Sequence, residues 1–221
     1  MFVTVKLRHF RDLAPMKLVL IRHPIPEIAP GTCYGRLDVP AQPPALAALV
    51  RGCLDLPRPQ AVFTSPLARC RAVASALANH GWPEPLSDQR LAELDFGQWE
   101  GQLWSEIGAA ALAAWRANLV GLAPPGGETV GALAERALAW ARDTLADSSL
   151  APDATIAIFT HAGVIQTLPR MLCDEPLEGF AATRIDYSTL TELHIASPGG
   201  TVTTARRISV ITRNQPVGPA S

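Results

Sequence analysis

The sequence predicts an α/β fold, a three-layer sandwich with a mostly parallel central sheet flanked by helices. Three apolar runs, at residues 18–21, 61–64 and 155–159, are typical of strands buried on both faces of a parallel sheet. Polar residues follow each run, and helical apolar spacing appears further along the chain. Because ligands bind at the carboxyl edge of such sheets, we expect those polar residues to form a site there.

The first predicted strand ends in a cation and an imidazole, Arg22 and His23. Pro24 and Pro26 prevent a strand or a helix from continuing unbroken, so His23 is expected in the loop just past the strand. An Arg-His pair in this position, taken alone, is more often a solvated pair than a catalyst. The residues at the other strand ends decide between a solvated pair and a catalytic one.

A loop rich in Pro and Gly follows, at residues 25–44. It contains Tyr34, Gly35 and Arg36 in succession. Because long loops in compact domains are usually functional or disordered, these three residues form a candidate substrate loop. The alternative is a surface turn closed by Asp38.

The second strand-to-helix junction carries an arginine. A covering helix is predicted over residues 44–54, and the strand at 61–64 follows it. Ser65 as N-cap and Pro66 at the first helical position predict the next helix start. Arg69 then lies in the first turn, where the helix dipole disfavours a cation, and this indicates a bound anion. A surface arginine with a distant partner is the alternative.

Residues 90–101 mix three carboxylates with two aromatic side chains, and Glu93 is the candidate general acid among them. Apolar walls around a buried carboxyl raise its pKa, as an acid working near neutrality requires. In the alternative, Phe96 and Trp99 anchor a loop while the acids face water. The residues alone leave both interpretations open.

Two scaffold helices are predicted over residues 103–120 and 128–146, because their apolar residues recur at helical spacing. Trp104 and Trp115 belong to the first of them. They are more typical of a core than of a stacking platform.

The third junction repeats the pattern of the first, because His161 follows another buried strand. The small residues Ala162 and Gly163 allow backbone N–H groups to approach a ligand at the start of a helix near Gly163, so both are candidate phosphate-binding residues. A single histidine in this place is usually a satisfied core residue. The shared context of His23 and His161 favours function.

The remaining residues complete the predicted domain organisation. Residues 184–211 alternate well enough for two or three strands. We expect an N-terminal extension at residues 1–15, a single domain at 16–213 and a loose tail at 214–221. Met16 stands directly before the first strand, which leaves the start of translation open between Met1 and Met16.

Composition indicates an ordinary soluble protein of 221 residues, with 19 Lys and Arg against 20 Asp and Glu. This balance gives no electrostatic reason to bind nucleic acid or an anionic membrane. The sequence has neither a membrane-length apolar stretch nor a secretory signal pattern, so a cytoplasmic protein is expected. The four cysteines lack metal-ligand spacing and are expected to be reduced and mostly buried.

The candidate residues together fit phosphoryl transfer. Guanidinium groups and helix N-termini bind phosphate oxygens, which carry charge in the transition state. Nearby cations also lower the pKa of an imidazole, which leaves a ring nitrogen free to attack phosphorus. This points to a histidine nucleophile. The sequence has no P-loop, no C-x5-R cysteine motif and no acidic metal cage, so other designs for phosphoryl transfer lose their support.

Five ordered motifs carry a family resemblance that spans residues 16 to about 195. They are Arg22-His23, Ser65-Pro66-Leu67-Ala68-Arg69, Leu91-Ala92-Glu93 with Phe96-Gly97-Gln98-Trp99-Glu100-Gly101, Gly126-Gly127-Glu128, and Thr160-His161-Ala162-Gly163. In this order they resemble the histidine phosphatase superfamily, which has the phosphoglycerate-mutase-like fold. The loop at residues 33–40 is most similar to that of α-ribazole phosphatases of cobalamin synthesis.

The resemblance implies a role for each residue. His23 would take the phosphoryl group, Arg22 and Arg69 would clamp its oxygens, and His161 would support the charge as it moves. Glu93 would protonate the leaving alkoxide and then deprotonate the attacking water. The family needs no metal and no cofactor.

The implied function is hydrolysis of a small phosphomonoester through a phosphohistidine, by a monomer or homodimer, with α-ribazole 5′-phosphate as the substrate indicated by loop similarity. Two departures are Pro24, where the family usually has Gly, and Ala29, where it often has Asn. Two alternatives stay open: a catalytically silent phosphate-binding module and a phosphoglycerate-type mutase. The presence of Glu93 argues against the silent module, because mere binding does not need the acid.

Overall fold

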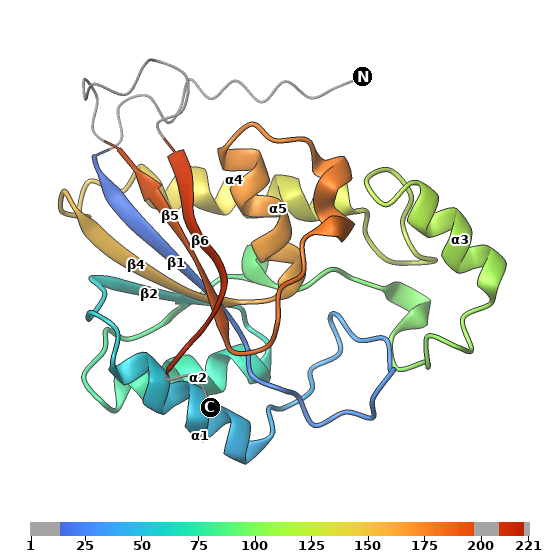
Figure 1. Ribbon diagram of the computed structural model, residues 1–221, viewed down its shortest axis with the longest axis horizontal. Coiled ribbons are helices and arrows are strands. Elements are labelled where there is room, and N and C mark those ends of the chain that lie inside the picture. Colours follow the sequence, from blue (N-terminus) through green and yellow to red (C-terminus); the bar gives the residue numbers. More distant parts are fainter. Residues whose placement is uncertain (1–13, 197–207, 219–221) are drawn as a thin grey trace.

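A computed structural model describes residues 14–196 and 208–218, and within them a six-stranded sheet has the order β3-β2-β4-β1-β5-β6 (Figure 1). The strands are β1 (Met16–Arg22), β2 (Ala61–Thr64), β3 (Leu86–Ser87), β4 (Ala154–Thr160), β5 (Thr189–Ile195) and β6 (Ile208–Pro216). The first four run parallel to one another, whereas β5 and β6 pair in antiparallel fashion. The predicted mostly parallel sheet is confirmed.

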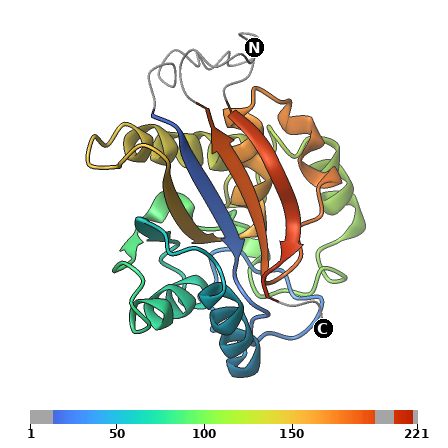
Figure 2. The same cartoon turned by 60° about the vertical axis from the view of Figure 1, so that its left-hand side comes forward.

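Helices cover both faces of this sheet, which confirms the three-layer arrangement (Figure 2). The α-helices are α1 (Pro43–Leu54), α2 (Ala68–Ala78), α3 (Ala109–Ala117), α4 (Val130–Leu145) and α5 (Ala162–Leu172), and the short 3-10 helices are η2 (Gln89–Leu91), η3 (Gly97–Trp99) and η4 (Leu177–Ala182). Helices α1 and α2 pack on one face, and α4 and α5 pack on the other. Helix α3 lies away from the sheet (Figure 1).

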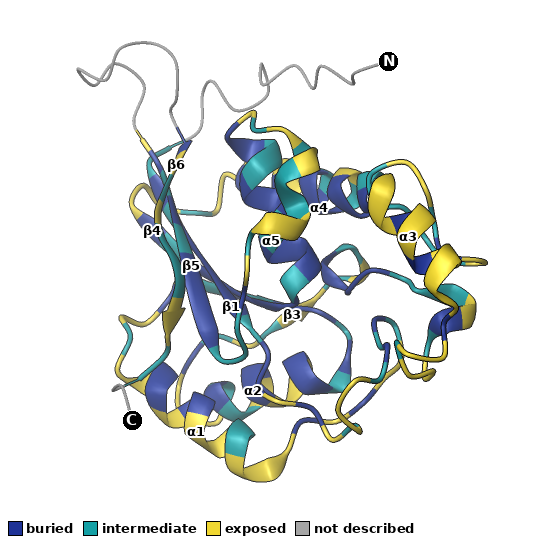
Figure 3. Cartoon of the chain, turned by 45° about the vertical axis from the view of Figure 1, so that its right-hand side comes forward, coloured by how far each residue is buried: buried dark blue, intermediate teal, exposed yellow. Residues whose placement is uncertain are grey.

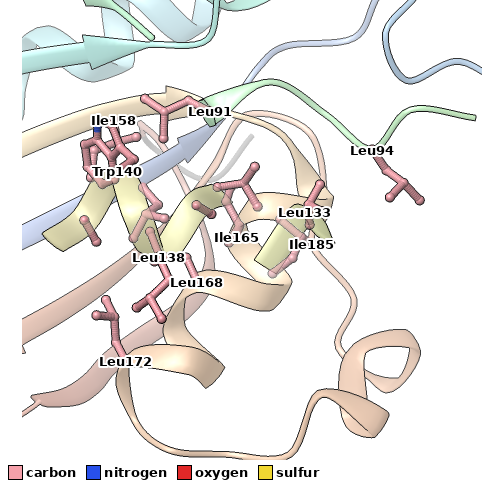
Figure 4. Packing of buried hydrophobic residues seen from close by; sticks show 14 of the residues in the cluster. Leu91, Leu94, Leu133, Leu138, Trp140, Ile158, Ile165, Leu168, Leu172 and Ile185 are labelled. Carbon is pink, nitrogen blue, oxygen red and sulfur yellow. The ribbon is translucent and has the colours of Figure 1, made fainter. Parts of the chain in front are cut away.

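Alternation along β1 divides the core between the two faces. Leu18 and Leu20 join the larger cluster with α4 and α5, and Val19 and Ile21 join the cluster with α1 and α2. Figure 3 shows β1, β5 and the inner helix faces as mostly buried and the outer helix faces as mostly exposed. Figure 4 shows the larger cluster, in which the fully buried Trp140 of α4 takes part.

Helix α2 begins later than the sequence predicted. Ser65 is not its N-cap, because the cap residue is Leu67 and the helix starts at Ala68. The carboxylate of Asp38, in the long loop, accepts the N–H of Ala68 at 2.6 Å. A side chain from outside the segment therefore accepts the first helical N–H, whereas the hydroxyl of Ser65 accepts the N–H of the cap residue Leu67 at 3.3 Å.

The predicted helix at 103–120 is shortened to α3, since residues before Ala109 pair with the long loop. Leu103 forms a bridge with Thr32, and the N–H of Trp104 donates to the carbonyl of Gly31. The helix predicted at 128–146 is present as α4.

The loose tail predicted from residue 214 is wrong for its first residues, because β6 continues to Pro216. Asn214 has a left-handed φ of 53°, which asparagine tolerates better than most residues. Its side chain accepts the N–H of Asp186 at 2.5 Å and donates to that carboxylate at 2.9 Å. These two hydrogen bonds join the end of β6 to the loop that precedes β5. Residues 1–13, 197–207 and 219–221 lie outside the described residues.

All four cysteines are buried, as predicted, and none of them forms a disulfide. Among the described residues, no helix has the length and apolar character that a membrane crossing needs.

Asn214→Ala should lower the free energy of unfolding by about 1–3 kcal/mol, because it leaves the N–H of Asp186 without its acceptor. Urea unfolding measures the change, with the exposed neighbour Gln215→Ala as a control. Equal stability of both variants and the wild type would contradict the ordered tail.

Candidate active site

His23 and His161 lie side by side at adjacent strand ends. The parallel register pairs Arg22 with Thr160, and the N–H of His23 donates to the carbonyl of Thr160 at 3.1 Å. The two ring centroids are 5.0 Å apart, and the residues are 1% and 0% exposed. The structure therefore brings together the two histidines that the sequence placed at one edge of the sheet.

A short hydrogen bond fixes the tautomer of His23. Its Nδ1 lies 2.7 Å from the carbonyl oxygen of Pro24, which can only accept, so Nδ1 carries the proton and Nε2 is left with its lone pair. Burial lowers the pKa of His23 well below its ordinary value, and the charges of Arg69 and Arg22 lower it further. At neutral pH the ring is uncharged, and Nε2 is free to act as a nucleophile.

Arg69 is fully buried in the first turn of α2. Its guanidinium donates to the carbonyls of Leu37 at 2.9 Å and Gly35 at 2.6 Å, and it lies 5.2 Å from the ring centre of Tyr34. Its Nε has no hydrogen-bond partner within the part of the chain that the structure describes. A buried donor of this kind suits an anionic oxygen.

Arg22 is held in a similar way from the other side. It donates to the carbonyl of Ile185 at 2.5 Å and lies 3.9 Å from the ring centre of Tyr187. Its buried Nε also lacks a partner among the described residues. Two cations with unused donors thus act on the same imidazole, His23.

Tyr34 and Tyr187 connect the two arginine sites. Their hydroxyl oxygens are 2.5 Å apart, and their ring centroids lie 6.5 and 5.6 Å from that of His23. Tyr34 was predicted as part of a substrate loop. Tyr187 was missed, because it precedes β5 in a segment whose sequence gives no signal of a site.

The loop that carries Tyr34 is organised by a carboxylate to which the sequence analysis assigned no individual role. Glu100 accepts the N–H groups of Gly35, Arg36, Leu37 and Phe96 at 2.8 to 3.0 Å. A side chain at Gly35 would collide, because its Cβ would lie 1.9 Å from the carbonyl oxygen of residue 94.

Gly35 and Arg36 contact other parts of the protein. The carbonyl of Gly35 holds Arg69. The guanidinium of Arg36 pairs with Glu128 at 3.7 Å. In this structure Gly35 therefore supports Arg69, and Arg36 links the loop to Glu128.

Glu93 is buried against the N-terminus of α5, with 9% of the residue exposed. Its carboxylate accepts the N–H of Gly163 at 3.1 and 3.2 Å and that of Leu94 at 2.9 Å. Gly163 thus binds the candidate acid, whereas the sequence predicted that it binds phosphate. The approach is so close that a Cβ at Gly163 would lie 2.2 Å from Oε1 of Glu93. Ala162 is the first residue of α5.

His161 is the N-cap residue of α5, and its Nε2 lies 2.7 Å from the hydroxyl of Ser65. Burial lowers its pKa well below the ordinary value, with contributions from Arg69 and His23. Ser65 is therefore a partner of His161. The sequence argument had assigned it to helix capping and so missed this contact.

Residues 14–196 and 208–218 contain no group of three or more His, Cys, Asp or Glu side chains that could hold a metal ion. The charged groups that face the two imidazoles are guanidiniums. Such a cluster attracts an anion with several oxygens, and a phosphoryl group fits that description.

The model of the histidine phosphatase superfamily (branch 1) matches residues 18–207. The chain therefore belongs to this superfamily, as its motifs predicted.

Known relatives include several phosphatases. The chain is 27% identical over 174 residues to a glucosyl-3-phosphoglycerate phosphatase of Mycolicibacterium vanbaalenii, covering 74% of this chain and 77% of the relative. The native structure of a mycobacterial glucosyl-3-phosphoglycerate phosphatase superposes with a TM-score of 0.76 at 24% identity, over 91% of this chain and 99% of that one. The α-ribazole phosphatase of Shigella flexneri superposes with a TM-score of 0.75 at 20% identity, over 93% and 100% of the two chains. These two structures support the phosphoglycerate-mutase-like fold.

Gly163→Ala should destabilise the protein by about 1–3 kcal/mol, because the new methyl group collides with the Glu93 carboxylate. Thermal and urea unfolding measure the loss. In a Glu93→Ala background the same substitution should lower the free energy of unfolding much less, because the colliding carboxylate is gone. An equal cost in both backgrounds would contradict the contact.

The lowered pKa values of His23 and His161 predict a loss of stability in mild acid. Below the ordinary value of 6.5, the unfolded chain binds protons at these residues while the folded protein does not, so the free energy of unfolding falls as the pH falls. His23→Asn and His161→Asn should each flatten this slope between about pH 6.5 and 5. The exposed His80 provides the control variant His80→Asn, and slopes unchanged in all three variants would refute the assignment.

Proposed function

We propose that this protein hydrolyses phosphomonoesters through a phosphohistidine intermediate on His23. The observation that carries the proposal is the state of His23, which is buried and uncharged, with Nδ1 bonded to Pro24 and Nε2 free. A neutral imidazole whose Nε2 lone pair is free needs no separate base to attack phosphorus. The guanidiniums of Arg22 and Arg69 provide the charge that draws a phosphate dianion to it.

In the first step, Nε2 of His23 attacks phosphorus and the bond to the ester oxygen breaks. Arg22 and Arg69 hold the equatorial oxygens with donors that include their buried Nε groups. Glu93, as the general acid, gives a proton to the departing alkoxide. The products are a free alcohol and a phosphorylated His23.

In the second step, the Glu93 carboxylate takes a proton from water. The oxygen of this water attacks phosphorus, the P–N bond breaks, and His23 and inorganic phosphate are released. His161, steadied by Ser65, lies beside the reacting ring and would donate a hydrogen bond to a phosphoryl oxygen. The role of Glu93 thus reverses between the steps.

Pro24 is compatible with this chemistry. Proline lacks the N–H that the usual glycine offers, but it keeps the carbonyl oxygen, and this oxygen orients His23. The replacement of glycine by Pro24 therefore preserves the hydrogen bond that sets the tautomer of His23.

We further propose a substrate of modest size. α-Ribazole 5′-phosphate is favoured by the similarity of the loop at residues 33–40, and glucosyl-3-phosphoglycerate is the second candidate, because a relative that is 27% identical carries this activity in its name. A phosphomonoester panel that includes both compounds should rank them.

Incubation with labelled phosphomonoesters tests the reaction. His23→Ala should abolish turnover and labelling, because it removes the nucleophile. Glu93→Gln should lower turnover of alkyl phosphates by about 10²–10⁴-fold, the usual contribution of a general acid. The covalent adduct should be stable in base and labile in acid, as a phosphoramidate is.

Turnover by His23→Ala near the wild-type rate would overturn the assignment. Phosphate binding without turnover by the wild type would indicate a silent module. Transfer of the label to a second hydroxyl, with a bisphosphorylated primer present, would indicate a mutase.

A further inference from the structure

Arg136 of α4 donates hydrogen bonds to the backbone of the segment that carries Glu93. Its Nη1 donates to the carbonyls of Arg90 at 2.8 Å and Ala92 at 2.7 Å, and its Nη2 donates to the carbonyl of Glu93 at 2.9 Å. Three carbonyls within four residues of chain therefore converge on one guanidinium. From the sequence, Arg136 was expected only to be part of a scaffold helix.

Glu128 holds this guanidinium from the opposite side. Its carboxylate accepts Nε of Arg136 at 3.0 Å and Nη2 at 2.5 Å, and it also accepts the N–H of Asp95 at 3.1 Å. A guanidinium has five N–H donors, and the five bonds to Glu128 and the three carbonyls use all of them. Arg136 therefore has no donor left for a substrate.

These contacts fix Glu93 at both ends. Arg136 holds its carbonyl, and the first turn of α5 holds its carboxylate through Gly163. Helices α4 and α5 pack against each other, so the two anchors belong to one rigid unit. Positioning of this kind matters because a displacement of about 1 Å in a catalytic group can cost about 10²-fold in rate.

We propose that Arg136, oriented by Glu128, is a positioning residue for the general acid Glu93. This inference rests on the proposed function. In this proposal Arg136 affects only the proton transfer from Glu93 to the leaving group. It has no part in the attack of His23 on phosphorus. Loss of Arg136 should therefore lower the rate of ester cleavage only for substrates whose leaving group needs a proton.

The test compares two leaving groups. Alkoxide departs poorly unless it is protonated, whereas p-nitrophenolate departs without a proton. Arg136→Met should lower kcat/KM for the best alkyl phosphate by about 10²-fold and that for p-nitrophenyl phosphate by less than about threefold. We use kcat/KM because it reports the step in which the ester bond breaks. Arg142→Met, at an exposed position of the same helix, is the matched control and should change neither value.

Glu128→Gln keeps the test decisive if Arg136→Met folds poorly, and a double variant adds a second check. Glu128→Gln retains the carbonyl contacts of Arg136 but removes the charge that orients it, and it should show a smaller loss with the same leaving-group dependence. In a Glu93→Gln background, Arg136→Met should cause no further loss on the alkyl substrate.

An equal loss on both substrates, or a full additional loss in the Glu93→Gln background, would overturn the positioning role. A wild-type protein that turns over neither substrate would instead reject the proposed function, so the two failures are distinguishable.

Discussion

Positive charge buried around two imidazoles is the constraint on which the rest of this structure depends. Arg69 is fully buried, and its two Nη groups donate hydrogen bonds to carbonyl oxygens of the long loop. Burying a cation is costly unless its donors are paired, so the loop must keep its shape. Glu100 maintains that shape by accepting four backbone N–H groups. Glu100 thus supports, through the loop backbone, the two carbonyl contacts of the buried Arg69.

The sheet determines which groups share this environment. Strands β2, β4 and β1 are neighbours and run in parallel, so the residues after them meet at one edge. Ser65, His161 and His23 are those residues. The N-terminus of α5 adds a backbone donor at the same edge, and Glu93 accepts it. Cations and imidazoles therefore cluster on one side of the site, and the candidate acid is held by a helix end.

The sequence predicted the parts of the site that depend on local order. Buried strands followed by proline or by small residues were enough to place His23 and His161 at one sheet edge. The structure also follows the predicted fold class. Of the six strands in the described part of the chain, five lie in segments that the sequence singled out, although β6 extends past residue 211. The parts that were missed, Tyr187, Glu100 and Arg136, act through partners far away in the chain, which no local pattern reveals. Ser65 was assigned to the helix start alone for the same reason, because its other partner, His161, is 96 residues away in the chain.

The ionisation and tautomer of His23 are the most direct measure of the central claim. Nitrogen-15 NMR of the histidine rings, assigned with His23→Asn, reports both. We expect a neutral ring with the proton on Nδ1 at pH 7, and we expect it to stay neutral below the ordinary pKa of 6.5, because burial and two guanidiniums oppose protonation. An imidazolium at pH 7, or a neutral ring with its proton on Nε2, would contradict the claim that this nitrogen is free to attack phosphorus.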